Sequence, residues 1–158
     1  YGKVQVPVRM IERAREINDE MPLHLVDLTM QALAERGGAS DGAKVAVLGV
    51  AYLEDSDDTR NTPAMAVIDA LQHKGASVVA HDPYVRELDG YELTRDLDLA
   101  LQGADAAVIV TRHRVYYGLD LARLKGIMHT PVLVDGRNVF DGEQVRAAGF
   151  TYKAIGKG

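Results

Sequence analysis

Short apolar runs and helix-like stretches alternate along most of this chain, with brief connections between them. The runs have the length of single strands and lie at residues 45–49, 77–81, 106–111, 132–135 and 150–155. Helices are expected between them at about 62–74, 97–102, 119–127 and 143–149. Continuous apolar runs suit strands that are buried on both faces of a sheet. Their strict alternation with helices predicts an α/β fold, a doubly wound parallel sheet with right-handed crossovers.

A long helix is expected before the first strand. Apolar residues recur at helical spacing from about residue 8 to 35. Pro22 lies inside this pattern and predicts a kink or a break just before it. The polar segment GGASDGA at 37–43 contains glycines that can end the helix, and it is the best internal boundary. We therefore divide the chain into a helical part, residues 1–38, and an α/β domain, residues 39–158.

The turn after the first strand has one glycine where a dinucleotide-binding unit has three. Gly49 is followed directly by Val50 and Ala51. Three spaced glycines let the backbone approach a pyrophosphate, so this turn is not expected to hold NAD in the usual way. Asp82 ends the second strand and has two interpretations. It could bind a ribose, or it could form a turn before Pro83, which we favour.

Ligands of such sheets bind beyond the carboxyl ends of the strands, and Arg60 lies at that edge. Its guanidinium could bind a phosphate or carboxylate in a bidentate way, aided by the helix N-terminus that follows. It could equally neutralise Asp57 and Asp58 on the surface, and the residues alone do not decide between these two roles. The acidic run 54–58 favours a solvated, capping loop over a calcium site, because it lacks the glycine and final glutamate of an EF-hand.

A second arginine, Arg137, follows the fourth predicted strand in the sequence DGRN. Arginines on neighbouring loops of one edge would form a pocket for a multiply charged anion, here Arg60 with Arg137. His113, in the loop 111–117, is expected on the same rim. A single histidine without a partner is more often a polar surface residue than a ligand-binding one.

Composition excludes several classes of protein. The 158 residues suffice for one domain and an extra helix, and the net charge of -5 argues against nucleic acid as the main partner. The absence of cysteine excludes disulfides, thiolate zinc sites and a cysteine nucleophile in this chain, and no metal site is expected. No apolar run approaches the ~20 residues of a membrane span, and no signal peptide is recognisable, so a cytoplasmic location is expected.

The start, YGKVQVPVRM, lacks an initiator methionine, and we expect a piece of a longer protein.

Four segments resemble, in order and spacing, the C-terminal domain of the UDP-glucose/GDP-mannose dehydrogenase family. They are VAVLGVAYLEDSDDTRNTPAMAVIDAL, GASVVAHDPYV, ADAAVIVTRH and VLVDGRNVFD. The segment AREINDEMPLHLVDL is similar to the end of the long central helix of that family, so the resemblance covers essentially the whole chain. The family oxidises the C6 alcohol of a nucleotide sugar to a carboxylate with NAD. The resemblance implies a Rossmann-like domain that binds the nucleotide sugar, and NDEMP and DGRNVFD lean toward the branch acting on UDP-N-acetylmannosamine.

The resemblance implies roles for five residues. Tyr52 and Leu53 match an aromatic–lysine pair that contacts the substrate. Leucine replaces the lysine here, so that contact is expected to be weaker or to be made elsewhere. Arg137 matches a substrate-binding arginine, and Arg60 an arginine that reaches the NAD bound by the N-terminal domain. His24 is expected to face the place where the family reaches into the site of the neighbouring subunit.

The same resemblance places the catalytic cysteine and the main NAD-binding domain upstream of Tyr1. No catalytic residue is therefore expected in this chain, which would bind a UDP-sugar such as UDP-glucose and work with the remainder of the same polypeptide. The apolar residues between 8 and 35 could pack on the domain or against a second copy, and we favour a homodimer. The alternative function is a non-catalytic Rossmann-like module for nucleotide binding or dimerisation. A self-contained small enzyme is not favoured, because no nucleophile or acid–base pair supports it.

Overall fold

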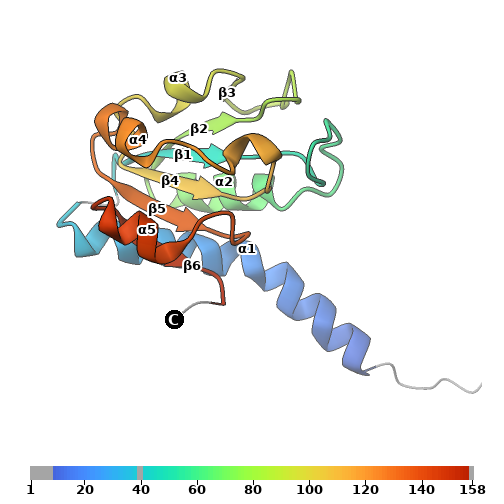
Figure 1. The fold of residues 1–158 in the computed structure, drawn as a ribbon. Coiled ribbons are helices and arrows are strands. Elements are labelled where there is room, and N and C mark those ends of the chain that lie inside the picture. Colours follow the sequence, from blue (N-terminus) through green and yellow to red (C-terminus); the bar gives the residue numbers. More distant parts are fainter. Residues whose placement is uncertain (1–8, 39–40, 157–158) are drawn as a thin grey trace, which may run out of the picture.

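The computed structural model describes residues 9–38 and 41–156 and shows a parallel sheet between two layers of helices (Figure 1). Its six strands follow the order β3-β2-β1-β4-β5-β6, and all neighbouring strands are parallel. They are β1 Lys44–Leu48, β2 Ser77–His81, β3 Leu93–Thr94, β4 Ala106–Ile109, β5 Val132–Asp135 and β6 Thr151–Ala154. This topology confirms the predicted doubly wound α/β fold, and the strand order reverses between β1 and β4.

Strand β3 is the element of the sheet that the sequence did not predict. It consists of two residues, which pair with Ala80 and His81 at the end of β2. So short a strand carries neither an apolar run nor an alternating pattern. The other strands lie within one or two residues of their predicted positions.

The helices divide into two layers. They are α1 Arg9–Glu35, α2 Ala64–His73, α3 Leu97–Leu101, α4 Leu121–Ile127 and α5 Gly142–Ala147, with a 3-10 turn, η1, at Arg114–Tyr116. Helices α1 and α2 pack on one face of the sheet, and α3, α4 and α5 pack on the other. Among the described residues, no helix combines the length and the apolar character that crossing a bilayer requires.

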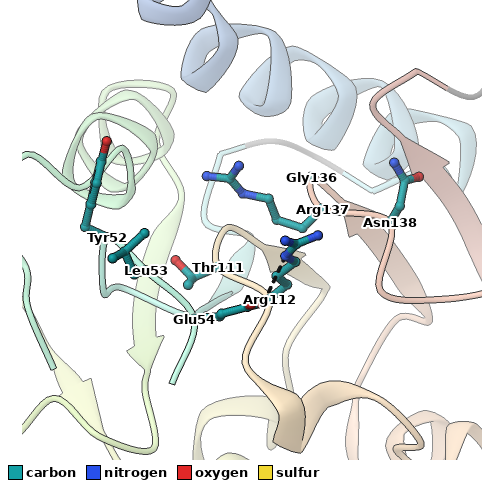
Figure 2. A pocket seen from close by; sticks show the side chains of 8 residues that line it. All are labelled: Tyr52, Leu53, Glu54, Thr111, Arg112, Gly136, Arg137 and Asn138. Carbon is teal, nitrogen blue, oxygen red and sulfur yellow. Dashed lines mark ion pairs between the residues drawn. The ribbon is translucent and has the colours of Figure 1, made fainter. Parts of the chain in front are cut away.

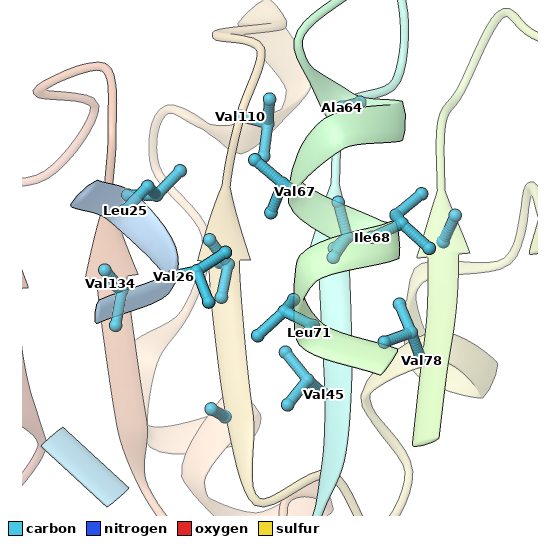
Figure 3. Close-up of a cluster of buried hydrophobic side chains, with 14 of the residues drawn as sticks. Leu25, Val26, Val45, Ala64, Val67, Ile68, Leu71, Val78, Val110 and Val134 are labelled. Carbon is cyan, nitrogen blue, oxygen red and sulfur yellow. The ribbon is translucent and has the colours of Figure 1, made fainter. Parts of the chain in front are cut away.

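Alternate residues of β1 face two separate cores, as the pleat of a strand requires. Val45 and Val47 belong to the core under α1 and α2, while Ala46 and Leu48 belong to the opposite core. Figure 3 shows the first core, where side chains of both helices lie over the strands: Leu25, Val26, Val67, Ile68 and Leu71. The burial of both faces explains why the strands read as continuous apolar runs.

Helix α1 is continuous through Pro22, so the alternative of a break at this position is wrong. Proline removes one hydrogen bond to the preceding turn. The following residues Leu25, Val26 and Leu33 are buried against the sheet and hold the helix in place. The C-terminal half of α1 is therefore part of the core, while its first turns extend past the sheet (Figure 1). The division of the chain after residue 38 stays a prediction.

Gly49 directly follows β1 and packs against Thr111 in the loop after β4. Its φ is +86°, in the left-handed region, and a Cβ at this position would lie 2.6 Å from the carbonyl oxygen of Thr111. Both the backbone conformation and the close approach exclude a side chain. The lone glycine of this turn thus has a packing role.

We expect Gly49→Ala to lower the free energy of unfolding by about 2–5 kcal/mol. About 1–2 kcal/mol comes from the left-handed backbone and about 1–3 kcal/mol from the contact with Thr111. Gly90→Ala is the matched control, because Gly90 has a φ of +83° and nothing lies within 4 Å of its added Cβ. Urea denaturation followed by circular dichroism measures both losses, and equal losses would show that the contact with Thr111 does not restrict this position.

Candidate functional site

The turn after β1 folds around a carboxylate from the end of β2. The side chain of Asp82 is fully buried, and its Oδ2 accepts hydrogen bonds from the backbone N–H of Val50 at 2.8 Å and of Ala51 at 3.1 Å. Its Oδ1 accepts from the N–H of Tyr84 at 2.9 Å and of Val85 at 3.0 Å. Asp82 is therefore a turn former, as favoured from the sequence, and it also ties its own turn to the turn after β1.

This arrangement explains why the β1 turn has no further glycines. In a dinucleotide-binding unit, the backbone N–H groups of this turn face a pyrophosphate. Here the N–H groups of Val50 and Ala51 donate to the carboxylate of Asp82. The residues of the turn therefore do not fit the pyrophosphate of a dinucleotide such as NAD.

His113 is buried, so its expected place on the surface rim is wrong. Its side chain is 0% exposed, and its Nε2 lies 2.9 Å from Oδ2 of Asp82. The backbone N–H of Asp55 donates to Nδ1 at 2.9 Å. Nδ1 is therefore the acceptor, and Nε2 carries the proton that is donated to Asp82. His113 thus connects the loop after β4 with the acidic loop and with Asp82.

Burial and hydrogen bonds set the charges of this network. Burial raises the pKa of Asp82, but the hydrogen bonds from His113 and from backbone N–H groups outweigh it and hold the pKa at about 2. Burial lowers the pKa of His81 to about 4, and Nδ1 of His81 lies 2.9 Å from the hydroxyl of Tyr116. At neutral pH the carboxylate is therefore charged and His81 is neutral. Asp82 is bound to His113 and His81 to Tyr116, so both pairs connect residues at the end of β2 with the segment after β4.

The acidic loop, residues 54–58, is bound to arginines. Three ion pairs connect them: Arg112 with Glu54 at 3.0 Å, Arg114 with Asp55 at 2.7 Å and Arg60 with Asp58 at 2.7 Å. In the part of the chain that the structure describes, no group of three or more potential ligands is placed to hold a metal ion. The loop is therefore an ion-paired surface rather than a simply solvated one.

Two adjoining pockets lie at the carboxyl ends of the strands and share four lining residues: Tyr52, Leu53, Gly136 and Arg137. The first pocket has a volume of about 440 Å³ and is also lined by Glu54, Thr111, Arg112 and Asn138 (Figure 2). The second has a volume of about 470 Å³, and its other lining residues are apolar: Met21, Pro22, Leu25, Pro63, Val67, Val110 and Ile155.

The turn after β5 holds Arg137 in place between the two pockets. Asp135 is fully buried, and its Oδ1 accepts from the backbone N–H of Arg137 at 2.9 Å. Its Oδ2 accepts from the N–H of Phe140 at 2.9 Å and from the hydroxyl of Tyr152 at 3.1 Å. Nε of Arg137 donates to the carbonyl of Val110 at 2.8 Å. Arg137 forms no ion pair with any described residue, so its charge is available to an anion in either pocket.

The structure brings together three of the five residues that the resemblance singled out. Tyr52, Leu53 and Arg137 form the wall common to both pockets. Arg60 lines neither pocket. Its Nε donates to Oδ1 of Asp58 at 2.9 Å, and its Nη2 donates to Oδ2 at 2.7 Å. This is the expected surface role, in which Arg60 neutralises a neighbouring carboxylate. His24 is exposed on α1 and also lines neither pocket. The ligand-binding roles of these residues stay predictions.

Arg112 is a charged residue of the first pocket that sequence reasoning did not single out. The expected pair was Arg60 with Arg137, but the arginine that shares a pocket with Arg137 is Arg112. Its place after β4, at the ligand-binding edge, was the only indication in the sequence. Its ion pair with Glu54 depends on how two loops approach each other, which a single sequence does not show.

The first pocket has the composition of an anion-binding site. Two arginines and one carboxylate line the first pocket, which suits a multiply charged anion such as a diphosphate. The described residues that line the two pockets include no histidine, lysine or serine. The hydroxyl of Thr111 donates to the carbonyl of Ala51 at 2.6 Å and supports the β1 turn.

Comparison with protein families identifies one match. Residues 46–142 match the UDP binding domain of the UDP-glucose/GDP-mannose dehydrogenase family. The matched segment runs from β1 into the start of α5 and contains the acidic loop and the turn that holds Arg137. The family match thus covers every residue that lines the first pocket.

Individual relatives are similar over almost the whole chain. UDP-glucose 6-dehydrogenase of Rhizobium meliloti is 38% identical over 156 residues, 96% of this chain and 35% of the relative. UDP-N-acetyl-D-mannosamine dehydrogenase of Pyrococcus horikoshii is 35% identical over 150 residues, 94% of this chain and 34% of the relative. The crystal structure of NDP-N-acetyl-D-galactosaminuronic acid dehydrogenase from Methanosarcina mazei Go1 matches with a TM-score of 0.93 and 39% identity, over 99% of this chain and 34% of that one. The chain spans about a third of the length of these relatives.

We expect Asp82→Asn to lower the free energy of unfolding at pH 7 by about 3 kcal/mol or more. The new amide cannot accept all the hydrogen bonds, so buried donors lose their partner. The pKa of about 2 lies below the ordinary 3.8, so the charged form stabilises the native state above about pH 4. This contribution, roughly 2 kcal/mol, is lost as the pH falls from 3.8 toward 2, and the variant lacks that part of the pH dependence.

Asp120→Asn is the control for this substitution. Oδ1 of Asp120 accepts from the N–H of Ala122 at 2.9 Å and of Arg123 at 3.1 Å at the start of α4. Asparagine caps a helix about as well as aspartate, so the change should stay within about 0.5 kcal/mol. Urea unfolding at pH 7 and at several values below pH 4.5 measures both variants. If Asp82→Asn were as stable as the control, the carboxylate would not hold the β1 turn.

Proposed function

The chain belongs to the UDP-glucose/GDP-mannose dehydrogenase family, and we propose that it is the part of a longer NAD-dependent enzyme that binds a UDP-sugar. In this proposal, the whole enzyme oxidises the C6 alcohol of the sugar to a carboxylate. UDP-glucose and UDP-N-acetylmannosamine are the proposed substrates, because relatives named for both sugars match this chain over most of its length.

The observation that carries this proposal is the pair of adjoining pockets with one common wall. Tyr52, Leu53 and Arg137 form that wall and border both spaces. The charge of Arg137 and the polar rim of the first pocket suit a diphosphate. The apolar side chains that line the rest of the second pocket suit a less charged part of the ligand. Leu53 adds no charge to the wall, so the cations of the site are arginines.

The residues of this chain bind and orient the ligand in the proposed reaction. NAD accepts a hydride when it is bound, but the β1 turn does not fit it, because Val50 and Ala51 already donate to Asp82. The proposed NAD site therefore lies mainly on another domain of the same polypeptide. Arg60 is the proposed contact from this chain to NAD, which its 86% exposed side chain supports.

The organisation of the longer protein is also proposed from the family. Residues 1–38 would form the end of a central dimerisation helix and 39–158 the nucleotide-sugar-binding domain of a homodimer. Leu23 is 54% exposed on α1, next to His24, which supports an outward-facing contact surface on this helix. His24 would then approach the site of the other subunit. The cytoplasmic location stays a prediction.

We expect Arg137→Ala to weaken the binding of UDP by about 1–3 kcal/mol, the usual size of a lost charge-assisted hydrogen bond. Calorimetric titration of residues 1–158 with UDP measures the dissociation constant. Arg95→Ala is the matched control, because Nε of Arg95 also donates to a backbone carbonyl, that of Pro83 at 3.2 Å, but Arg95 lines neither pocket. An unchanged dissociation constant for Arg137→Ala would remove Arg137 from the site.

In the full-length protein, we expect Arg60→Ala to raise KM for NAD about tenfold and to leave KM for the UDP-sugar unchanged. The substitution removes an exposed charge from the proposed cofactor contact but not from either pocket. Steady-state kinetics with each substrate varied in turn separates the two effects. An increase in KM for the UDP-sugar alone would contradict the assignment of Arg60 to NAD.

A further inference from the structure

Arg112 and Arg137 come from adjacent loops and line the same pocket. Strands β4 and β5 are parallel neighbours, with Ile109 opposite Asp135, so their loops leave the sheet side by side. Both arginines border the first pocket, as Figure 2 shows. Two cations therefore face one space of about 440 Å³.

A single exposed ion pair restrains Arg112. Its Nε lies 3.0 Å from Oε2 of Glu54, and the two side chains are 56% and 53% exposed. Exposed pairs of this kind are weak, because water and salt compete with both partners. The terminal nitrogens of Arg112 bind no other described residue, so the guanidinium can exchange Glu54 for another anion at little cost.

The other two arginines that form ion pairs with the acidic loop are bound differently from Arg112. Arg60 contacts Asp58 through two nitrogens, a bidentate geometry. Arg114 is paired with Asp55, whose side chain is only 19% exposed and also accepts from the backbone N–H of Arg114 and from Tyr84. Neither arginine lines the two pockets. Among the three pairs, the one at the pocket has the most exposed carboxylate.

Charge balance connects this pair to the ligand. The first pocket has two arginines, but Glu54 neutralises one of them while the pocket is without an anion. A diphosphate would attract both guanidinium groups and repel the carboxylate. We infer that Arg112 is a second phosphate-binding residue of this site and that Glu54 competes with the ligand for it. This inference rests on the proposed function, since it adds a residue to the same UDP site.

Calorimetric titration of residues 1–158 with UDP at fixed ionic strength tests the inference in four proteins: wild type, Arg112→Gln, Glu54→Gln and the double variant. Arg112→Gln should weaken binding about tenfold, as the loss of a charge-assisted hydrogen bond does. Glu54→Gln should tighten binding about two- to fivefold, because Arg112 no longer has a competing partner. In the double variant this gain should be absent, because Glu54 acts through Arg112.

Arg114→Gln is the matched control for charge. It removes the same charge two residues away and outside both pockets, so the dissociation constant should change less than twofold. Circular dichroism and the urea midpoint confirm that every variant is folded. Arg112→Lys, which keeps the charge but not the planar group, should bind more tightly than Arg112→Gln.

Each other outcome overturns a defined part of the inference. If Arg112→Gln binds UDP like Arg114→Gln, Arg112 does not contact the phosphates. If Glu54→Gln gives the same gain with and without Arg112, Glu54 repels the ligand directly and does not compete for the arginine. If Arg137→Ala weakens binding and Arg112→Gln does not, this inference fails while the proposed function stands. A folded wild-type chain that does not bind UDP would overturn both.

Discussion

The buried carboxylate of Asp82 fixes the geometry on which the binding edge depends. It directly follows β2, and its five donors come from the β1 turn, its own turn and the loop after β4. An unpaired charge at this depth would cost several kcal/mol, so the three loops are held as one unit. Tyr52 and Leu53 directly follow the donors of the β1 turn, and Arg112 directly precedes His113. Two walls of the first pocket are thus attached to the same carboxylate.

Burial decides how much of this structure could be predicted from the sequence. The strands were predictable because a sheet covered on both faces leaves apolar runs, and the place of Arg137 at the binding edge was predictable because it comes two residues after such a run. The pair of Asp82 and His113 was not predictable, because its members lie 31 residues apart and one sequence does not show which polar side chains turn inward. Arg112 was overlooked for a different reason, because its ion pair with Glu54 depends on how two loops approach each other. At Pro22 the local rule favoured a kink or a break, but tertiary packing keeps the helix unbroken.

The turn after β1 does not depend on a bound nucleotide for its folding. In a phosphate cradle, backbone N–H groups stay without a protein partner until the ligand arrives. Here Asp82 satisfies them permanently, so the turn needs no nucleotide to be complete. The cations of the proposed site lie instead on loop surfaces, where Arg112 and Arg137 are exposed. Exposed side chains can adapt to a ligand at small cost, while the buried network below them keeps its form.

Helix α1 runs from the second pocket into the space beyond the sheet. Met21, Pro22 and Leu25 line that pocket, and the helix continues without a break to Arg9. At a rise of 1.5 Å per residue, the turns before Met21 extend over about 18 Å. One unbroken helix thus lines the second pocket at Met21 to Leu25 and extends past the sheet at its N-terminal end, so a surface that packed on its first turns would be joined to the pocket wall by continuous backbone.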